Sequence, residues 1–327
     1  MRVGINGLGR IGRGLFKTLW DDSRIEVAAV NDVAEPGVIA HLLNHDSYYG
    51  PWSRKAEISP SGIQVGGREI PLHRGSAPAE IPWDLDGVDW VIDATGRFKK
   101  RDLLAGHGRP VILTASSRDL DRQVVFGVNH GDIAAADRFL SATSCTTHCV
   151  VPPVHALARR FGCRSLWFNT VHCYNVSQPL VDAPLKDVRR SRAGALNLIP
   201  TTTSASLSVE AVLPELVGKV HGMAVRVPAP AVSLTEITLL TETPVDRPVV
   251  IACLQEASSG YLAGILALSS DELVSQDFLG NPASSIIDLP LVDARDGVIR
   301  LIAWYDNEAG YVARLVDLLG FLGEKPS

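Results

Sequence analysis

The stretch VGINGLGRIG, residues 3–12, decides the fold of this chain. It places glycines with the spacing G-x-G-x-x-G between an apolar run and a helical pattern over residues 10–20. In such a turn Gly7 permits the sharp reversal, Gly9 lets the backbone approach a pyrophosphate, and Gly12 lets helix and strand pack closely. The free N–H groups and partial positive charge of the helix N-terminus then face the phosphates. The stretch therefore predicts a dinucleotide-binding βαβ unit.

A carboxylate follows at the distance that this motif requires. Asp32 lies 20 residues beyond Gly12, directly after a second apolar run over residues 25–30. A carboxylate there accepts hydrogen bonds from the adenosine ribose hydroxyls. Because its charge also repels a 2′-phosphate, the sequence predicts NAD rather than NADP. The alternative is a purely structural glycine turn with a helix-capping aspartate.

The rest of the first half repeats this alternation of short apolar runs and helical patterns. Near-continuous apolar strands separated by helices indicate a parallel sheet that is covered on both faces. The expected strands cover residues 3–5, 25–30, 88–92, 111–113, 124–128 and 139–140.

After about residue 150 the pattern changes to longer strands in which apolar and polar residues alternate. Alternation is typical of an antiparallel sheet with two different faces. We expect helices over 147–161 and 309–322, strands over 166–174, 223–227, 233–241 and 298–305, and a long polar segment over 175–204. The chain is thus predicted to be α/β, with a Rossmann dinucleotide-binding domain followed by an α+β domain whose sheet is mainly antiparallel.

Composition narrows the class of protein. A chain of 327 residues favours two lobes over one. The net charge of −5 argues against nucleic-acid and membrane-surface partners. A strand-like stretch over residues 2–6 follows Met1 directly, and no apolar run reaches the ~18 residues of a membrane helix. Five cysteines in a chain of this size do not suggest a secretory disulfide framework. We therefore expect a cytoplasmic protein.

The segment SATSCTTHC, residues 141–149, carries the strongest chemical signal. Its serines and threonines precede an apolar helix, which predicts Cys145 at a helix N-terminus, where the dipole lowers a thiol pKa from about 8.5. His172, at the end of an apolar strand, is a candidate base. The alternatives are a buried structural thiol and a core histidine. Cys145, His148 and Cys149 lack a distant fourth ligand, so no metal site is expected.

Together with the glycine turn, these residues resemble the phosphorylating glyceraldehyde-3-phosphate dehydrogenase family. The resemblance extends over nearly the whole length. Its motifs lie at residues 6–13, 31–32, 144–147, 186–192, 199–203, 224–228 and 304–308.

The resemblance implies a mechanism and a set of roles. Cys145 would attack an aldehyde with His172 as its activating partner, and hydride transfer to NAD would leave a thioester that inorganic phosphate cleaves. Cofactor contacts are implied for Gly7, Gly9, Arg10, Ile11, Gly12, Asp32 and Asn307. Two anion pockets, for the phosphorylated aldehyde and for phosphate, are implied at Ser144, Thr146, Asn175, Arg192, Thr203, Ser204 and Arg226. Arginine suits phosphate geometry, but the run around Arg192 could instead be a solvated charged face.

The resemblance also implies domain boundaries and assembly. The NAD-binding domain would comprise residues 1–144, completed by a C-terminal helix over 306–327, and the catalytic domain residues 145–305. The polar segment 175–204 matches the family's S-shaped loop at a subunit interface, which implies a homotetramer.

Several positions near the expected substrate differ from the family pattern. They are Asn175, Ser177, Ser204, His148, Ala309 and Cys173, where the family usually has Thr, Asp or Thr, Gly, Asn, Trp, and Ser or Ala. Three alternatives to glyceraldehyde 3-phosphate oxidation therefore stay open: a paralogue for another phosphorylated aldehyde such as erythrose 4-phosphate, an inhibitor-resistant copy, and a non-catalytic binding protein.

Overall fold

The computed structural model describes residues 1–324 and divides into two compact units. The first contains Met1–Val124, His130–Thr143 and the chain from Arg314 on, and the second contains Val125–Asn129 and Ser144–Ala313. The units thus differ from the expected boundaries at 125–129, at residue 144 and at 306–313, all of which belong to the second unit.

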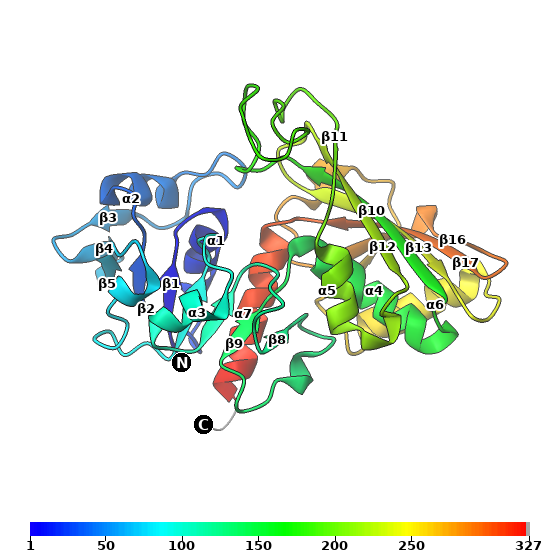
Figure 1. Cartoon of the computed structure of the whole chain (residues 1–327), viewed down its shortest axis with the longest axis horizontal. Helices are drawn as coiled ribbons and strands as arrows, with labels where there is room; N and C mark the ends of the chain where they lie inside the picture. Colours follow the sequence, from blue (N-terminus) through cyan, green and yellow to red (C-terminus); the bar gives the residue numbers. More distant parts are fainter. Residues whose placement is uncertain (325–327) are drawn as a thin grey trace. The chain divides into compact units, whose positions relative to one another are not determined.

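The first unit is built on a nine-stranded sheet (Figure 1). Seven neighbouring strands are parallel, and a hairpin-linked pair extends one edge with antiparallel pairing. In spatial order the strands are β3 (Ala56–Ile58), β4 (Gly62–Val65), β5 (Arg68–His73), β2 (Glu26–Asn31), β1 (Arg2–Asn6), β6 (Trp90–Asp93), β7 (Val111–Leu113), β9 (Phe139–Ser141) and β8 (Arg122–Gln123). Its helices are α1 (Arg10–Leu19), α2 (Pro36–Asn44), α3 (Arg101–Leu104) and the later part of α7 (Ala309–Glu324).

The second unit has an eight-stranded, mainly antiparallel sheet. Only the β10–β12 and β14–β15 pairs are parallel. The strand order is β11 (Ile199–Thr201), β12 (Val220–Val227), β10 (Ser165–Cys173), β13 (Ser233–Leu240), β17 (Val298–Tyr305), β15 (Ser285–Asp288) and β14 (Leu266–Ser269), with β16 (Asp293–Arg295) paired to β17.

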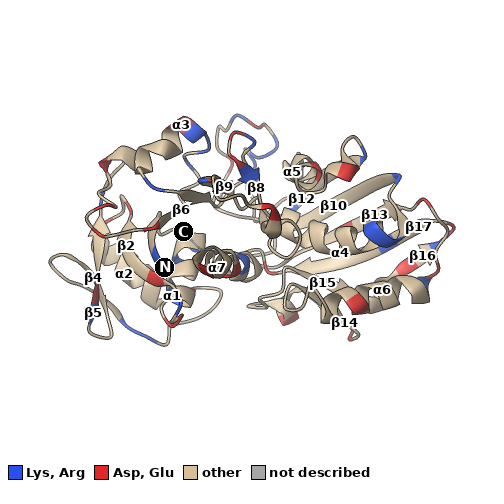
Figure 2. Ribbon diagram, turned by 90° about the horizontal axis from the view of Figure 1, so that it is seen from below, with Lys and Arg blue, Asp and Glu red and all other residues tan. Residues whose placement is uncertain are grey.

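Three helices pack on this second sheet. They are α4 (Cys145–Phe161), α5 (Ala205–Val212) and α6 (Arg247–Ser259), and α4 contacts both of the others. In Figure 2 the ribbon of α4 is tan except near one end, and the last turn of the helix holds Arg159 and Arg160. The remaining turns of α4 are largely buried. An apolar helix on an apolar sheet face forms the core of this unit.

The expected fold class is confirmed, and most expected elements lie within two residues of their observed bounds. The expected strand at 124–128 is wrong. Its first two residues, Val124 and Val125, are buried, but the strand is the two-residue β8 just before them. A short apolar run indicates that its residues are buried, but it does not by itself indicate a strand. Helices α2 and α6 and the β3–β5 hairpins were not anticipated.

In the part of the chain that the structure describes, no helix is both long and apolar enough to cross a membrane.

Candidate active site and dinucleotide pocket

The turn between β1 and α1 has the geometry that its glycines predict. Gly7 has a φ of +93°, a region that disfavours side chains. A Cβ on Gly12 would lie 1.9 Å from the Gly7 carbonyl oxygen, whereas a Cβ on Gly9 would meet no atom within 4 Å. Gly9 is the N-cap of α1, and no side chain caps the helix. The turn therefore leaves space and helix N–H groups for an anion.

A pocket of about 230 Å³ opens beside this turn, at the carboxyl ends of the parallel strands. Open α/β sheets bind ligands at this end of their strands. The lining residues are Asn6, Gly7, Gly9, Asn31, Asp32, Val33, Gly75, Ser76, Ala77, Ala94, Thr95, Arg97 and Phe98.

Asp32 lines this pocket and also holds the turn closed. Its Oδ2 accepts the Leu8 N–H at 2.6 Å, and its Oδ1 accepts the Ala34 N–H at 2.8 Å. A carboxylate has about four acceptor sites, so two backbone bonds leave capacity for ribose hydroxyls. The residues present fit the adenosine and pyrophosphate parts of a dinucleotide.

Several lining residues were missed by the sequence analysis. Asn6, Thr95 and Arg97 line the pocket. Asn6 ends β1, and the other two follow β6. The available signal was positional, because polar residues just after parallel strands meet at one sheet edge.

Cys145 begins helix α4 as predicted. Ser144 is the N-cap, and its Oγ accepts the Thr147 N–H at 3.2 Å. His172 lies near the end of β10, and its Nε2 is 3.6 Å from the Cys145 Sγ. The fold thus brings together a thiol and an imidazole that are 27 residues apart.

Arg226 lies beside this pair because β12 runs parallel to β10 with His172 and Arg226 in register. Its Nη1 donates to the Cys173 carbonyl oxygen at 3.0 Å and contacts the His172 Nδ1. The Nδ1 lies 2.7 Å from the same carbonyl oxygen. The carbonyl only accepts and the guanidinium only donates, so the two contacts of Nδ1 favour opposite tautomers. In the tautomer with Nδ1–H directed at the carbonyl, the Nε2 lone pair faces the thiol.

The pKa shifts describe the charge state of this pair. Burial, reinforced by the Arg226 charge, lowers the pKa of His172 to about 3. Burial raises the pKa of Cys145, and the charge of Arg226 and the Thr146 amide oppose that rise. The expected lowering of the thiol pKa by the helix terminus is therefore wrong for the free protein, since loss of hydration outweighs it. A neutral imidazole beside a protonated thiol is arranged for proton transfer.

Two further site residues connect to this pair. The Thr146 Oγ1 lies 3.0 Å from the hydroxyl of Tyr305, a buried residue that the sequence analysis missed. The Cys173 thiol donates to the Asn307 Oδ1 at 3.1 Å. Thr146 and Asn307 therefore belong to the same cluster as Cys145 and His172.

Comparison with known proteins identifies the family of this chain. Residues 1–101 match the model "Glyceraldehyde 3-phosphate dehydrogenase, NAD binding domain", and residues 144–307 match the corresponding C-terminal domain. The chain is 41% identical to glyceraldehyde-3-phosphate dehydrogenase 1 of Bacillus cereus over 330 residues, covering 99% of both chains. It is also 41% identical to glyceraldehyde-3-phosphate dehydrogenase of Geobacillus stearothermophilus and of Streptomyces coelicolor, with the same coverage.

The chain belongs to the glyceraldehyde-3-phosphate dehydrogenase family. The expectations of an NAD cofactor and of an oxidoreductase are thereby confirmed.

In this family member the residues expected to bind phosphate are not all connected. The Arg192 Nε pairs with Asp182 at 2.7 Å on the exposed loop, and the Asn175 Oδ1 accepts from the Ser177 backbone and hydroxyl. The side-chain contacts of these two residues thus lie within the loop and not in the Cys145 cluster. Thr203 accepts the Ala205 N–H at 3.1 Å, and Ser204 is the exposed N-cap of α5.

His148, a departure from the family pattern, lies inside the second unit. Its ring is buried and packs edge-on against Tyr311, with ring centres 5.4 Å apart. Its Nδ1 is 3.1 Å from the Ser144 carbonyl oxygen. Among residues 1–324, no group of three or more His, Cys, Asp or Glu side chains is arranged to hold a metal ion.

Proposed function

We propose that this protein oxidises glyceraldehyde 3-phosphate to 1,3-bisphosphoglycerate, with NAD as hydride acceptor and inorganic phosphate as acyl acceptor. The observation that carries this proposal is the 3.6 Å approach of the Cys145 Sγ to the Nε2 of a neutral, buried His172 beside Arg226. Such a pair forms a thiolate on demand and then protonates or stabilises an oxyanion.

In the first step the Cys145 thiol transfers its proton to the His172 Nε2, and the sulfur forms a bond to the aldehyde carbon. The carbonyl π electrons move to oxygen, which the imidazolium stabilises and protonates in the thiohemiacetal. His172 then recovers that hydroxyl proton as the carbon loses hydride, and a thioester remains on Cys145. A phosphate oxygen attacks the thioester carbonyl, and the C–S bond breaks to release an acyl phosphate. The His172 imidazolium returns its proton to the sulfur, which regenerates the thiol and the neutral imidazole.

NAD, when bound, supplies the hydride acceptor. Gly7, Gly9 and Gly12 with the backbone of Arg10 and Ile11 would hold its pyrophosphate, Asp32 its adenosine ribose, and Asn307 its nicotinamide carboxamide. The open space at Gly9 and the uncapped N-terminus of α1 support the first assignment.

The anion sites are proposed around Arg226, the half-buried guanidinium nearest the reacting pair. Ser144 and Thr146 would contribute from the start of α4. Asn175, Arg192, Thr203 and Ser204 would complete the sites. Arginine forks and hydroxyl donors are the groups that phosphate prefers.

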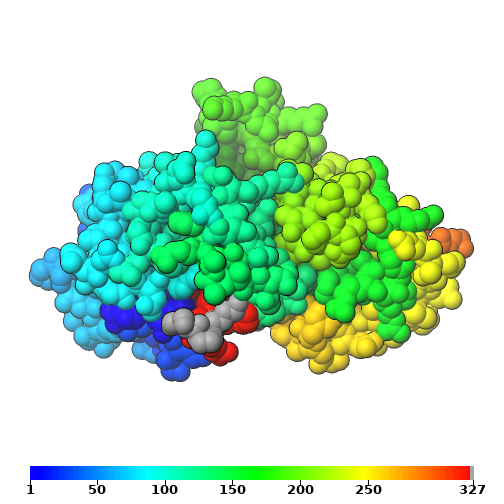
Figure 3. All heavy atoms as spheres, turned by 60° about the horizontal axis from the view of Figure 1, so that its bottom comes forward, coloured from blue at the N-terminus to red at the C-terminus, as the bar shows by residue number. Residues whose placement is uncertain are grey.

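We assign the NAD-binding domain to residues 1–144 with the C-terminal residues 306–327, of which 325–327 lie outside the described residues, and the catalytic domain to 145–305, in a cytoplasmic homotetramer. Support for self-association comes from the segment 174–198, which stands out from the surface in green in Figure 3. It exposes several large apolar side chains, namely Val176, Leu180, Val181, Val188, Leu196 and Leu198. Clusters of this kind mark protein interfaces.

The test is an assay with NAD and a panel of phosphorylated aldehydes, including erythrose 4-phosphate, with and without inorganic phosphate. We expect phosphate-dependent NADH formation that is fastest with glyceraldehyde 3-phosphate. Cys145→Ser should abolish it while NAD binding persists. Cys149→Ser is the matched control, because this buried thiol on the same helix contacts Ser285 rather than His172. Absence of turnover with every aldehyde would support a binding protein instead.

A second experiment restores the family residues at two of the substituted positions. Asn175→Thr with Ser204→Gly restores the family residues and should lower the KM for glyceraldehyde 3-phosphate. If the double variant instead loses activity towards the best aldehyde of the panel, the site serves a different substrate.

A further inference from the structure

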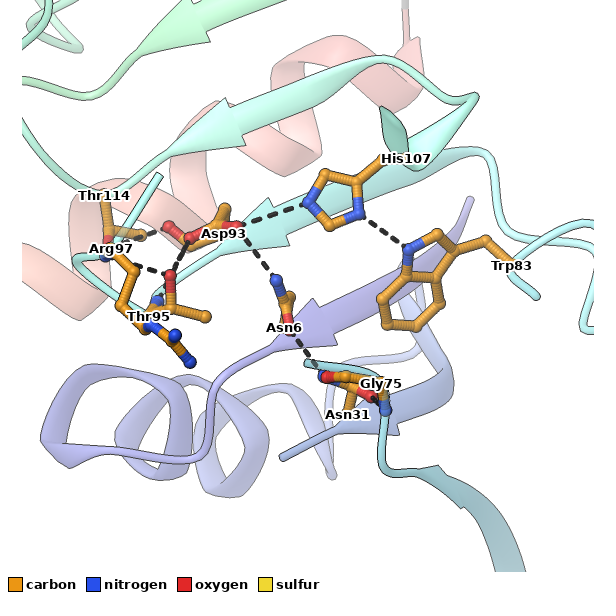
Figure 4. A network of polar contacts seen from close by, with 9 residues as sticks. All are labelled: Asn6, Asn31, Gly75, Trp83, Asp93, Thr95, Arg97, His107 and Thr114. Atoms are coloured by element: carbon orange, nitrogen blue, oxygen red, sulfur yellow. Dashed lines mark hydrogen bonds and ion pairs between the residues drawn. The ribbon is translucent and has the colours of Figure 1, made fainter. Parts of the chain in front are cut away.

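A fully buried Asp–His pair lies under the dinucleotide pocket, within the first unit. Asp93 ends β6, His107 follows α3, and both side chains are 0% exposed. The His107 Nε2 lies 3.3 Å from the Asp93 Oδ2 (Figure 4). Neither residue belongs to the Cys145 cluster. Burying a carboxylate costs free energy unless hydrogen bonds of good geometry satisfy its oxygens.

Trp83 fixes which nitrogen of His107 carries the proton. The indole Nε1–H donates to the His107 Nδ1 at 2.9 Å. An indole N–H can only donate, so Nδ1 is the unprotonated nitrogen and Nε2–H faces Asp93. His107 is thus a neutral bridge between a carboxylate and an indole, each with its hydrogen bond satisfied.

The Asp93 carboxylate in turn accepts hydrogen bonds from residues that line the pocket. Its Oδ1 accepts from the Thr95 N–H at 3.1 Å and the Thr95 hydroxyl at 2.7 Å, and its Oδ2 accepts from Asn6 at 2.9 Å. The Asn6 Oδ1 accepts from Asn31 at 2.8 Å, and the Asn31 Oδ1 accepts the Gly75 N–H at 2.8 Å. One chain of hydrogen bonds therefore links the ends of β6, β1 and β2 to Gly75 (Figure 4).

The residues that these hydrogen bonds connect to Asp93 on the pocket side all line the pocket; they are Thr95, Asn6, Asn31 and Gly75. Thr95 also backs the glycine turn, since a Cβ on Gly7 would lie 2.9 Å from the Thr95 backbone nitrogen. The Thr95 hydroxyl in turn accepts the Arg97 N–H at 3.1 Å. This bond holds the backbone of Arg97, another lining residue, in place.

We propose that His107 is a positioning residue for NAD: held by Trp83, it fixes the Asp93 carboxylate, which fixes the Thr95 turn and the floor of the pocket. The inference rests on the proposed placement of NAD in this pocket. Without the His107 N–H, Asp93 loses one of its four donors and Trp83 its acceptor. The carboxylate then regains rotational freedom, and its bonds to Thr95 and Asn6 weaken together.

Three variants test this by calorimetric NAD titration and by steady-state kinetics. His107→Leu removes both bonds, whereas His107→Gln can accept from Trp83 and donate to Asp93. Leu104→Ala is the matched control, because this residue is fully buried in α3 of the same unit but does not line the pocket. Trp83→Phe, which keeps an aromatic ring and loses only the N–H donor, is the substitute should His107→Leu fail to fold.

For His107→Leu we expect the Kd and KM for NAD to rise about tenfold, with kcat at saturating NAD within about twofold of the unmodified protein. His107→Gln should recover most of the affinity, and Leu104→Ala should lower the Tm while leaving the Kd unchanged. An unchanged Kd in His107→Leu, or an equal loss in Leu104→Ala, would overturn the proposal and leave the pair a purely structural one. Failure of the unmodified protein to bind NAD would instead overturn the proposed function.

Discussion

Single side chains at the two sites act on more than one neighbour at a time. The Asp32 carboxylate closes the glycine turn through Leu8 while it faces the pocket, and Arg226 donates to a backbone carbonyl while it sets the charge around His172 and Cys145. A substitution at such a residue changes more than one property, so conservative replacements and matched controls separate the effects.

Cofactor choice follows from the charge of Asp32. Asp32→Asn keeps an acceptor oxygen but removes the negative charge, so the preference for NAD over NADP should fall about tenfold. The measurement is the ratio of kcat/KM for the two cofactors. Glu35→Gln is the control, because this nearby exposed carboxylate pairs with Arg74 and does not line the pocket. Equal use of both cofactors by the unmodified protein would contradict the assignment.

The positive charge of Arg226 should influence how the rate of Cys145 alkylation depends on pH. Burial raises the pKa of Cys145, and the positive charge of Arg226 opposes that rise by favouring the thiolate. In Arg226→Met this opposing charge is lost, so the midpoint of the rate against pH should move to higher pH. The rate of iodoacetamide labelling, mapped to Cys145 by mass spectrometry, measures this. Arg192→Met is the control, since Arg192 pairs with Asp182 on the exposed loop. A midpoint that stays in place or moves down would show that Arg226 does not act on the thiol.

At the scale of elements, the helices that begin at the two proposed sites differ in how their N-termini are capped. Helix α1 has no side-chain cap and opens on the pocket, whereas α4 is capped by Ser144 and presents a thiol. The uncapped terminus suits an anionic ligand, and the capped terminus suits a fixed nucleophile.

Two glycines of the α1 turn should behave differently when replaced by alanine. Gly9→Ala meets open space, so its Tm should stay close to that of the unmodified protein. Its NAD affinity should fall, because the new methyl group would occupy the side where we propose that the pyrophosphate binds. Gly12→Ala would collide with the Gly7 carbonyl, so both Tm and NAD affinity should fall. Thermal melts and NAD titrations measure the pair. Undiminished NAD affinity in Gly9→Ala would place the pyrophosphate elsewhere.

Elements with a strong local signal could be predicted from the sequence. The glycine spacing specifies the β1–α1 turn, and the serines and threonines before Cys145 specify the start of α4. The approach of Arg226 to His172 had no such signal, because it depends on the parallel register of two strands 54 residues apart. The same holds for the Trp83–His107 bond. The direction of the Cys145 pKa was missed because burial, unlike a helix terminus, cannot be read from neighbouring residues.

At the scale of the whole molecule, the exposed apolar side chains of the 174–198 segment are the feature that a single chain leaves unexplained. Leu180 is 81% exposed and Val181 is 74% exposed, which is costly for a segment that faces water. Burial of such residues between subunits would offset that cost.

A homotetramer should sediment with four times the chain mass of 35.1 kDa. Leu180→Asp with Val181→Asp places charges in the proposed interface, so analytical ultracentrifugation should find smaller species. Leu85→Asp is the control, because Leu85 is 86% exposed in the first unit, far from this segment in the sequence. A monomeric unmodified protein, or a double variant that assembles normally, would contradict the assignment of the loop to an interface.

The first unit is closed by residues from both ends of the chain. From Arg314 on, α7 belongs to it, with Leu315, Leu318 and Leu319 buried, Gly320 against Arg24 and Gly323 against Met1. A ribosome delivers the chain from its N-terminus, and domains that are continuous in sequence can fold as they emerge. Here the nascent first unit must wait through the translation of the entire second unit for its last helix. The part of the protein that is synthesised first is therefore the last to be completed.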